Sequence, residues 1–92
     1  MLLTDKVCLI TGAASLRGIG RATAKLFASH GAKVVILDLD AGQAEEAARS
    51  LGEGHVGLAC NVTDKAACQA AADEVVARFG RIDVLVNNAG IT

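Results

Sequence analysis

The chain has 92 residues, a length that suits one small domain. Apolar residues make up 52% of it and charged residues 21%, a balance typical of a globular protein rather than a disordered one. The formal net charge is -1 and no block of basic residues occurs, which argues against a nucleic-acid partner. No apolar run approaches the roughly 20 residues of a membrane span, and the first residues lack a signal-peptide pattern, so no membrane partner is expected.

The three cysteines are Cys8, Cys60 and Cys68. Their number is odd, and their spacings match neither a disulfide framework nor a zinc site, so no metal site is expected. Each lies among apolar residues, which predicts buried thiols and a reducing, cytoplasmic setting. The chain contains no tyrosine, so a mechanism that needs a tyrosine acid or base cannot be completed by this chain alone.

Apolar runs and helical spacing alternate along the chain, and glycines separate them. We expect a first strand over residues 6–11, followed by a helix that starts near Gly18 and ends before a left-handed Gly31. The expected inward residues of this helix are Ile19, Ala22, Leu26 and Phe27. A second strand is expected over residues 33–38.

The second half of the chain repeats this alternation. A helix is expected over residues 41–51, ended by Gly52 and Gly54, then a strand over 55–60. Thr63 or Asp64 is expected to cap a third helix that runs to about residue 79, and a fourth strand follows over 82–87. The expected inward residues of the two helices are Ala44, Ala47, Ala48, Leu51, Cys68, Ala71, Ala72, Val75 and Phe79.

Strands and helices in strict alternation, with continuous apolar strands, predict an α/β fold with a parallel sheet covered on both faces. Right-handed crossovers then give a Rossmann-type doubly wound sheet with strand order 3-2-1-4. The sequence stops at Thr92, just after the fourth strand, where one sheet face would carry only the third helix. We therefore expect residues 1–92 to be the N-terminal part of one larger domain, truncated after this strand.

The glycine-rich segment 11–20 leaves the first strand and opens the first helix, which is the setting of a pyrophosphate site. Glycines let the backbone approach phosphates closely, and a helix N-terminus offers N–H groups and a positive dipole end. Arg17 can add a bidentate phosphate contact, although a solvated loop arginine fits this position equally well. The predicted contact residues of this segment are Gly12, Ser15, Arg17, Gly18, Ile19 and Gly20.

Asp38 ends the second strand 18 residues after Gly20, close to the spacing of about 20 expected for the acidic residue that binds an adenosine ribose. Its carboxylate would accept hydrogen bonds from the ribose hydroxyls and repel a 2′-phosphate, so we expect NAD rather than NADP. Leu39, the next residue, belongs to the same predicted site. The alternative interpretation, an acidic residue that only follows a strand into solvent, is the one we assign to Asp40.

Two further polar segments follow the third and fourth strands. An amide after the third strand can pair with an adenine edge beside an apolar side chain, and small residues after the fourth let a sugar approach. An ordinary turn explains each segment equally well on its own. All of these segments, however, lie at the carboxyl ends of parallel strands, where open α/β sheets bind ligands. The predicted contact residues here are Asn61, Val62, Asn88, Ala89 and Gly90.

With these motifs the chain resembles the short-chain dehydrogenase/reductase family, particularly its 3-oxoacyl-carrier-protein-reductase-like members, over essentially all 92 residues. The motifs are TGAASLRGIG over residues 11–20, NVTD over 61–64 and RIDVLVNNAG over 81–90, of which the last is the most specific. Two features depart from the family pattern. Five residues separate Gly12 from Gly18 where the family usually has three, and Asn61 stands where the family usually has Asp.

The resemblance implies a homo-oligomeric, NAD(P)-dependent oxidoreductase that transfers hydride between the cofactor and a secondary alcohol or ketone. The family's catalytic Ser, Tyr and Lys lie beyond the fourth strand, so no residue here is assigned a catalytic role and the chain alone is expected to be inactive. Two other hypotheses remain open: a non-catalytic nucleotide-binding module that ends naturally at Thr92, and another Rossmann class that binds a flavin or a methyl donor. The segment 87–90 argues against the second of these.

Overall fold

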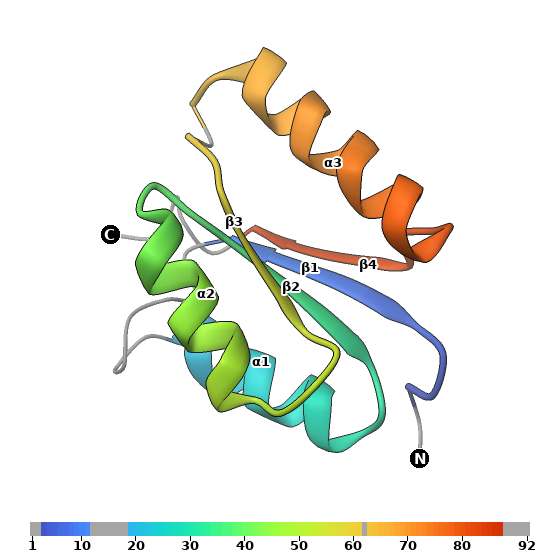
Figure 1. Ribbon diagram of the computed structural model, residues 1–92. Coiled ribbons are helices and arrows are strands. Elements are labelled where there is room, and N and C mark those ends of the chain that lie inside the picture. The colour runs from blue at the N-terminus through green and yellow to red at the C-terminus, as the bar shows by residue number, and fades with distance from the viewer. Residues whose placement is uncertain (1–2, 12–18, 62, 88–92) are drawn as a thin grey trace.

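The computed structural model describes residues 3–11, 19–61 and 63–87 (Figure 1). Strands and helices alternate along these ranges, as the sequence predicts. The elements are β1 (Val7–Thr11), α1 (Ile19–Ser29), β2 (Lys33–Asp38), α2 (Ala41–Ser50), β3 (Val56–Ala59), α3 (Lys65–Phe79) and β4 (Val84–Asn87).

The strands form one parallel sheet with the order β3-β2-β1-β4, which confirms the predicted Rossmann-type arrangement. In the central pair, Val7 is opposite Lys33 and Thr11 is opposite Leu37. All five residues of β1 are buried, and so are residues 34–37 of β2. A strand that is buried on both faces needs apolar side chains on both, which explains why these strands are continuous apolar runs.

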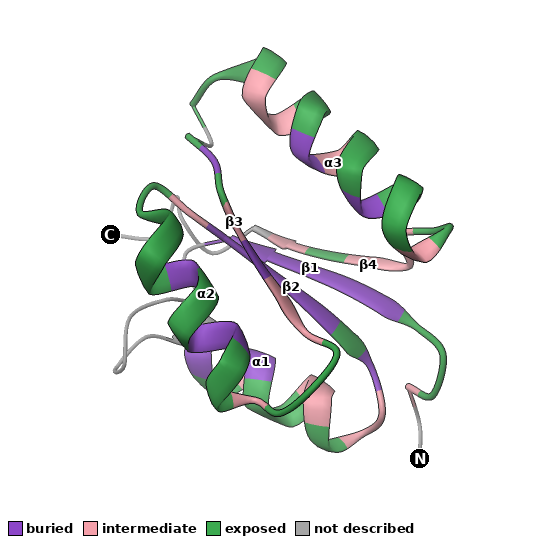
Figure 2. Cartoon of the chain, viewed as in Figure 1, coloured by how far each residue is buried: buried purple, intermediate pink, exposed green. Residues whose placement is uncertain are grey.

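Helices cover both faces of the sheet: α1 and α2 lie on one face and α3 lies on the other (Figures 1 and 2). Side chains alternate along each strand, so Cys8 and Ile10 of β1 face α1 and α2, whereas Val7 and Leu9 face α3. The layer under α2 is built from alanines, which allow the helix backbone to approach the sheet closely. At Gly57 of β3, a Cβ atom would overlap the backbone of α2 at Ala44 and Glu45.

The buried face of α1 differs from the prediction. Leu26 is 55% exposed and Ala22 is also exposed, whereas Ala24 and Arg21 are buried and Phe27 is half-buried. The Arg21 Nη2 donates a 2.6 Å hydrogen bond to Ser50 Oγ at the end of α2. The helix is therefore oriented by a small residue against the sheet and by a polar contact with α2, and the larger apolar side chain of Leu26 stays outside.

Aspartates begin two of the helices, and a left-handed glycine follows two of them. Asp40 Oδ1 accepts from Gln43 N at 3.1 Å, so this exposed residue caps α2 and does more than follow a strand into solvent. Asp64, rather than Thr63, caps α3 by accepting from two backbone N–H groups. Gly31 after α1 and Gly80 after α3 have φ values of 93° and 84°, the left-handed region in which glycine is favoured.

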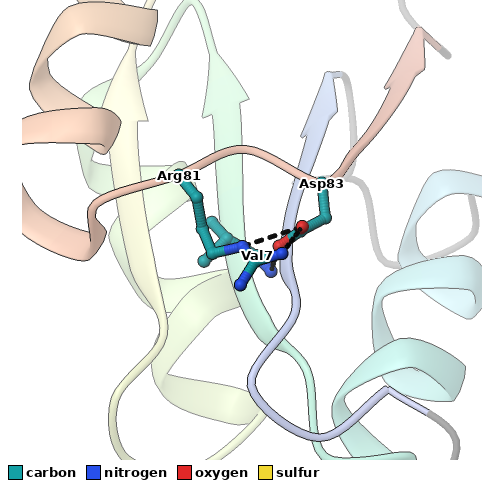
Figure 3. A network of polar contacts seen from close by, with 3 residues as sticks. All are labelled: Val7, Arg81 and Asp83. Carbon is teal, nitrogen blue, oxygen red and sulfur yellow. Dashed lines mark hydrogen bonds and ion pairs between the residues drawn. The ribbon is translucent and has the colours of Figure 1, made fainter.

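Two side chains complete the sheet at the amino ends of its strands. His55 Nδ1 accepts a 3.0 Å hydrogen bond from Val34 N of β2. Asp83 Oδ2 accepts from Val7 N of β1 at 2.8 Å, while its own backbone N–H donates to Val7 O at 2.9 Å (Figure 3). In each case a side chain, rather than a backbone carbonyl of the neighbouring strand, accepts the hydrogen bond from the backbone N–H. The strands therefore begin at residues 56 and 84, one and two residues later than the sequence pattern predicts.

Both of these groups have perturbed pKa values. Burial, and then the positive charge of Lys33, lower the pKa of His55 from its ordinary 6.5. The backbone N–H of Val7, followed by the Arg81 side chain, lowers the pKa of Asp83 from its ordinary 3.8. Arg81 and Asp83 also form an ion pair, with Nη2 and Oδ1 2.6 Å apart. The neutral imidazole and the charged carboxylate are thus the forms that hold the strand ends.

The His55 contact predicts a pH-dependent stability. Because the pKa of His55 is lower in the folded chain than its ordinary 6.5, its contribution is complete above pH 6.5 and is lost as the pH falls below that value. His55→Ala leaves the buried Val34 N–H without this acceptor, which costs about 1–3 kcal/mol at neutral pH. His55→Asn keeps an acceptor that does not titrate. In urea unfolding from about pH 7.5 to about pH 5, we expect the wild type to lose stability more steeply than His55→Asn; equal slopes would contradict this account.

Gly57 provides a second test of the fold. A methyl group at this position meets the α2 backbone at Ala44 and Glu45, so α2 must move away from the sheet. We expect Gly57→Ala to lower the unfolding free energy in urea by about 3 kcal/mol. The control is Gly42→Ala on the exposed start of α2. We expect this substitution to change the unfolding free energy by less than about 1 kcal/mol. Equal effects of the two substitutions would show that the close approach at Gly57 is not needed.

Candidate functional site

The candidate site lies along the carboxyl edge of the sheet. Thr11 of β1 pairs with Leu37 on one side and with Asn87 on the other, and Asp38 pairs with Ala59. All four strands therefore end along the same edge, and the segments that follow them start there. Helix α1 also points its N-terminal end toward this edge (Figure 1). This is the edge at which open α/β sheets bind ligands.

Much of the predicted site falls outside the described residues. These positions are Gly12, Ser15, Arg17, Gly18, Val62, Asn88, Ala89 and Gly90. Ile19 and Gly20 form the first turn of α1, and the side chain of Ile19 is also outside the description. The glycine-rich segment therefore remains a prediction. The structure describes only the two elements that flank it, the end of β1 and the start of α1.

Asp38 is held in place from two directions. Its backbone oxygen accepts a 2.7 Å hydrogen bond from Cys60 N, which ties the end of β2 to the residue that follows β3. Its carboxylate Oδ1 accepts from Asp40 N at 3.2 Å. Among the described residues no hydrogen bond to Oδ2 is seen, so the half-buried carboxylate keeps acceptor capacity for a ligand. Leu39, which follows it, is 74% exposed and presents an apolar surface beside this carboxylate.

Asn61 is exposed, and its side-chain orientation is fixed. Its Oδ1 accepts from Thr63 N at 3.0 Å and from Thr63 Oγ1 at 2.7 Å. Because a backbone N–H needs an acceptor, the amide oxygen must face Thr63, and the amide NH₂ group must point the other way. Asn61 therefore offers donors to a ligand. The bond from Cys60 N to Asp38 O ties the residue before Asn61 to the end of β2, so Asp38 and Asn61 both lie along the carboxyl edge of the sheet.

Three residues at this edge were not identified from the sequence as members of a site. The buried hydroxyl of Thr11 donates to Val86 O at 3.5 Å and thus links the ends of β1 and β4. The thiols of Cys60 and Cys68 lie together, with their Sγ atoms 3.9 Å apart. A sequence signal for the pair exists, since one cysteine ends the third predicted strand and the other lies in the first turns of the following helix.

The described residues show no metal centre and no membrane span. No group of three or more histidine, cysteine or acidic side chains within residues 3–11, 19–61 and 63–87 could hold a metal ion. In the same part of the chain, no helix is long and apolar enough to cross a membrane.

Comparisons with known proteins agree with this arrangement. A family model described as enoyl-(acyl carrier protein) reductase matches residues 12–92. An uncharacterised short-chain type dehydrogenase/reductase of Sinorhizobium fredii is 56% identical over the whole chain, and the match covers 38% of that protein. D-threitol dehydrogenase of Mycolicibacterium smegmatis is 53% identical over 97% of the chain, which corresponds to 35% of that enzyme.

The fold has a similar counterpart among solved structures. The crystal structure of 3-ketoacyl-(acyl-carrier-protein) reductase from Brucella melitensis, complexed with NADH, superposes with a TM-score of 0.83 at 42% identity. The match covers 90% of this chain and 33% of that one, so the chain spans little more than a third of the length of these relatives. The motifs, the sheet order and these matches agree, and the chain belongs to the short-chain dehydrogenase/reductase family.

Proposed function

We propose that the chain is the nicotinamide-dinucleotide-binding part of an oxidoreductase that transfers hydride between its cofactor and a secondary alcohol or ketone. The observation that carries this proposal is the placement of Asp38 and Asn61 at one sheet edge, joined by the 2.7 Å bond from Cys60 N to Asp38 O. The NADH bound to the Brucella melitensis reductase, which is 42% identical, supports it. A homo-oligomeric assembly and a cytoplasmic setting belong to the same proposal.

The described residues fit the adenosine half of such a cofactor. The Asp38 carboxylate can accept from the ribose hydroxyls through the oxygen that Asp40 N does not use. Because the Asn61 oxygen is occupied by Thr63, its NH₂ group can donate only to an acceptor, which on adenine is a ring nitrogen rather than the exocyclic amine. Leu39 supplies an exposed apolar side chain beside them.

The remainder of the cofactor would follow the other strand ends. The glycine-rich segment, with Gly12, Gly18 and Gly20, would approach the pyrophosphate in front of the α1 N-terminus. Asn88, Ala89 and Gly90 would lie near the nicotinamide ribose. The nicotinamide supplies the hydride acceptor or donor of the reaction, and this chain binds and orients it. No described residue is assigned a proton-transfer role, and the chain has no tyrosine for one.

The choice between NAD and NADP would depend on Asp38. A 2′-phosphate would place its negative charge against this carboxylate, so the proposal favours NAD. We expect Asp38→Asn to weaken NAD binding about tenfold, because hydrogen bonds to a charged acceptor are lost. We also expect it to narrow the preference for NAD over NADP. Affinities for both nucleotides, measured by calorimetry on the full-length protein, check this.

The matched control is Asp40→Asn. It removes the same charge two residues away, and asparagine still caps α2. We expect the control to leave the ratio of NAD to NADP affinity close to that of the wild type. If both substitutions shift the ratio equally, the effect comes from net charge and Asp38 has no specific role in recognition.

The hydride transfer itself is tested by comparing two proteins. The 92-residue chain, with no tyrosine, is expected to show no turnover with any secondary alcohol, whereas the full-length protein should reduce NAD with one of them. Absorbance of the reduced nicotinamide reports the reaction in both samples. Reproducible turnover by the pure 92-residue chain would contradict the proposed division between cofactor binding and chemistry.

A further inference from the structure

Two thiols lie in contact beside the candidate site. Cys60 follows β3 and is 5% exposed, and Cys68 lies in the first turns of α3. Their Sγ atoms are 3.9 Å apart. Cys68 Sγ is also 3.9 Å from the backbone oxygen of Asn61, the residue between them that carries the amide of the site. The third cysteine, Cys8, is buried in the cluster on the opposite face of the sheet.

The backbone already brings these two residues together. Asp64 N donates to Asn61 O at 3.0 Å, and Cys68 N donates to Asp64 O at 3.0 Å, so the chain turns back on itself between the thiols. A disulfide needs the sulfurs at about 2.05 Å. Closing the remaining gap requires side-chain rotation and a small approach of α3 to β3, and no long loop has to be ordered first.

The two thiols differ in access. Cys68 is partly exposed and lines an apolar pocket of about 210 Å³ together with Leu9, Leu37, Ala72, Ile82 and Leu85. A small neutral oxidant can reach Cys68 through this pocket. Cys60 lies deeper, where burial, and then the hydrogen bond to Cys68, raise the pKa of its thiol. The more accessible Cys68 sulfur would therefore react first. The Cys60 sulfur would resolve the product because it lies only 3.9 Å away.

We propose that Cys60 and Cys68 are a modification site, at which a peroxide converts the two thiols to a reversible disulfide that links the end of β3 to α3. The Cys68 sulfur attacks hydrogen peroxide: an S–O bond forms, the O–O bond breaks, and the leaving hydroxide takes a proton to become water. The Cys60 sulfur then attacks the sulfenic acid. An S–S bond forms, the S–O bond breaks, and the second hydroxide leaves as water with the Cys60 proton. The two thiols lose two electrons, and the peroxide gains them.

The disulfide has a consequence for the cofactor, and this part rests on the proposed function. It closes a ring over residues 60–68, which contains Asn61, and Cys60 is the residue whose N–H binds Asp38 O. Moving the two sulfurs together displaces the segment that orients the adenosine contacts. Oxidation therefore weakens nucleotide binding, and a thiol reductant restores it.

The first test is direct detection of the bond. Folded full-length protein is treated with hydrogen peroxide, and its intact mass and non-reduced peptides are measured by mass spectrometry. We expect a loss of about 2 Da and a peptide pair joining Cys60 to Cys68, both reversed by dithiothreitol. The matched control is Cys8→Ser, which should form the same bond at the same rate, whereas Cys60→Ser and Cys68→Ser should not show the mass loss.

Several results would overturn the proposal. Accumulation of sulfinic acid on Cys68 without the peptide pair would show that Cys60 cannot reach it. A bond that involves Cys8 would show that reactivity follows unfolding rather than the native contact. The same experiment in denaturant supplies the reference, since there the pairing among Cys8, Cys60 and Cys68 depends on loop length alone, and the native contact should raise the rate of the Cys60–Cys68 bond above that reference. Circular dichroism of each reduced variant establishes that it is folded.

The second test separates the disulfide from its consequence. NAD affinity is measured for the reduced and the oxidised wild type and for peroxide-treated Cys60→Ser. We expect oxidation to weaken NAD binding by the wild type about fivefold, within the usual range of coupling between two sites, and we expect the affinity of Cys60→Ser to be the same before and after peroxide treatment. Equal affinity in both redox states refutes the coupling, and no binding by the reduced wild type refutes the proposed function. The mass result stands in either case.

Discussion

The parallel pairing of β1 with β2 is the constraint on which the remainder of the structure depends. Both strands are buried on both faces, so helices must pack on each side of the sheet. Parallel strands require long crossovers, and each crossover here is a helix that returns the chain to the same edge. Every strand therefore ends along one edge, and the polar residues that follow the strands gather there without any contact being needed among them.

The two edges of the sheet use their polar side chains differently. At the amino edge, His55 and Asp83 bind backbone N–H groups of the central strands and serve the fold. At the carboxyl edge, Asp38 and Asn61 are fixed by one or two local bonds, and among the described residues no bond is seen to the second Asp38 oxygen or to the Asn61 NH₂ group. An aspartate occurs at each edge, Asp83 at the amino edge and Asp38 at the carboxyl edge. The side chains at the two edges thus differ in the hydrogen-bonding capacity that remains after their local bonds are made.

The same distinction explains how much could be predicted from the sequence. Residues 7–11 and 33–38 are identifiable as strands because burial on both faces leaves a continuous apolar run. The starts of β3 and β4 were placed too early, because the side chains of His55 and Asp83 replace backbone acceptors, and no local pattern reveals this. The face of α1 was also wrong, since its orientation depends on a partner 29 residues away, Ser50. That the polar residues after the strands share one edge was predicted from the expected parallel strand order alone.

Cys60 joins the core to the candidate site. Its side chain lies in the apolar cluster beneath α3, and its backbone N–H donates to the backbone oxygen of Asp38 at the end of β2. The position of Asp38 is therefore coupled to the packing of α3 against β3, through a single 2.7 Å bond and one turn of chain. A change that moves α3, whether a substitution in the cluster or a bond between the two thiols, would therefore be transmitted to Asp38 and Asn61, which follow β2 and β3 at the carboxyl edge. Under the proposed function, such a change would act on nucleotide affinity.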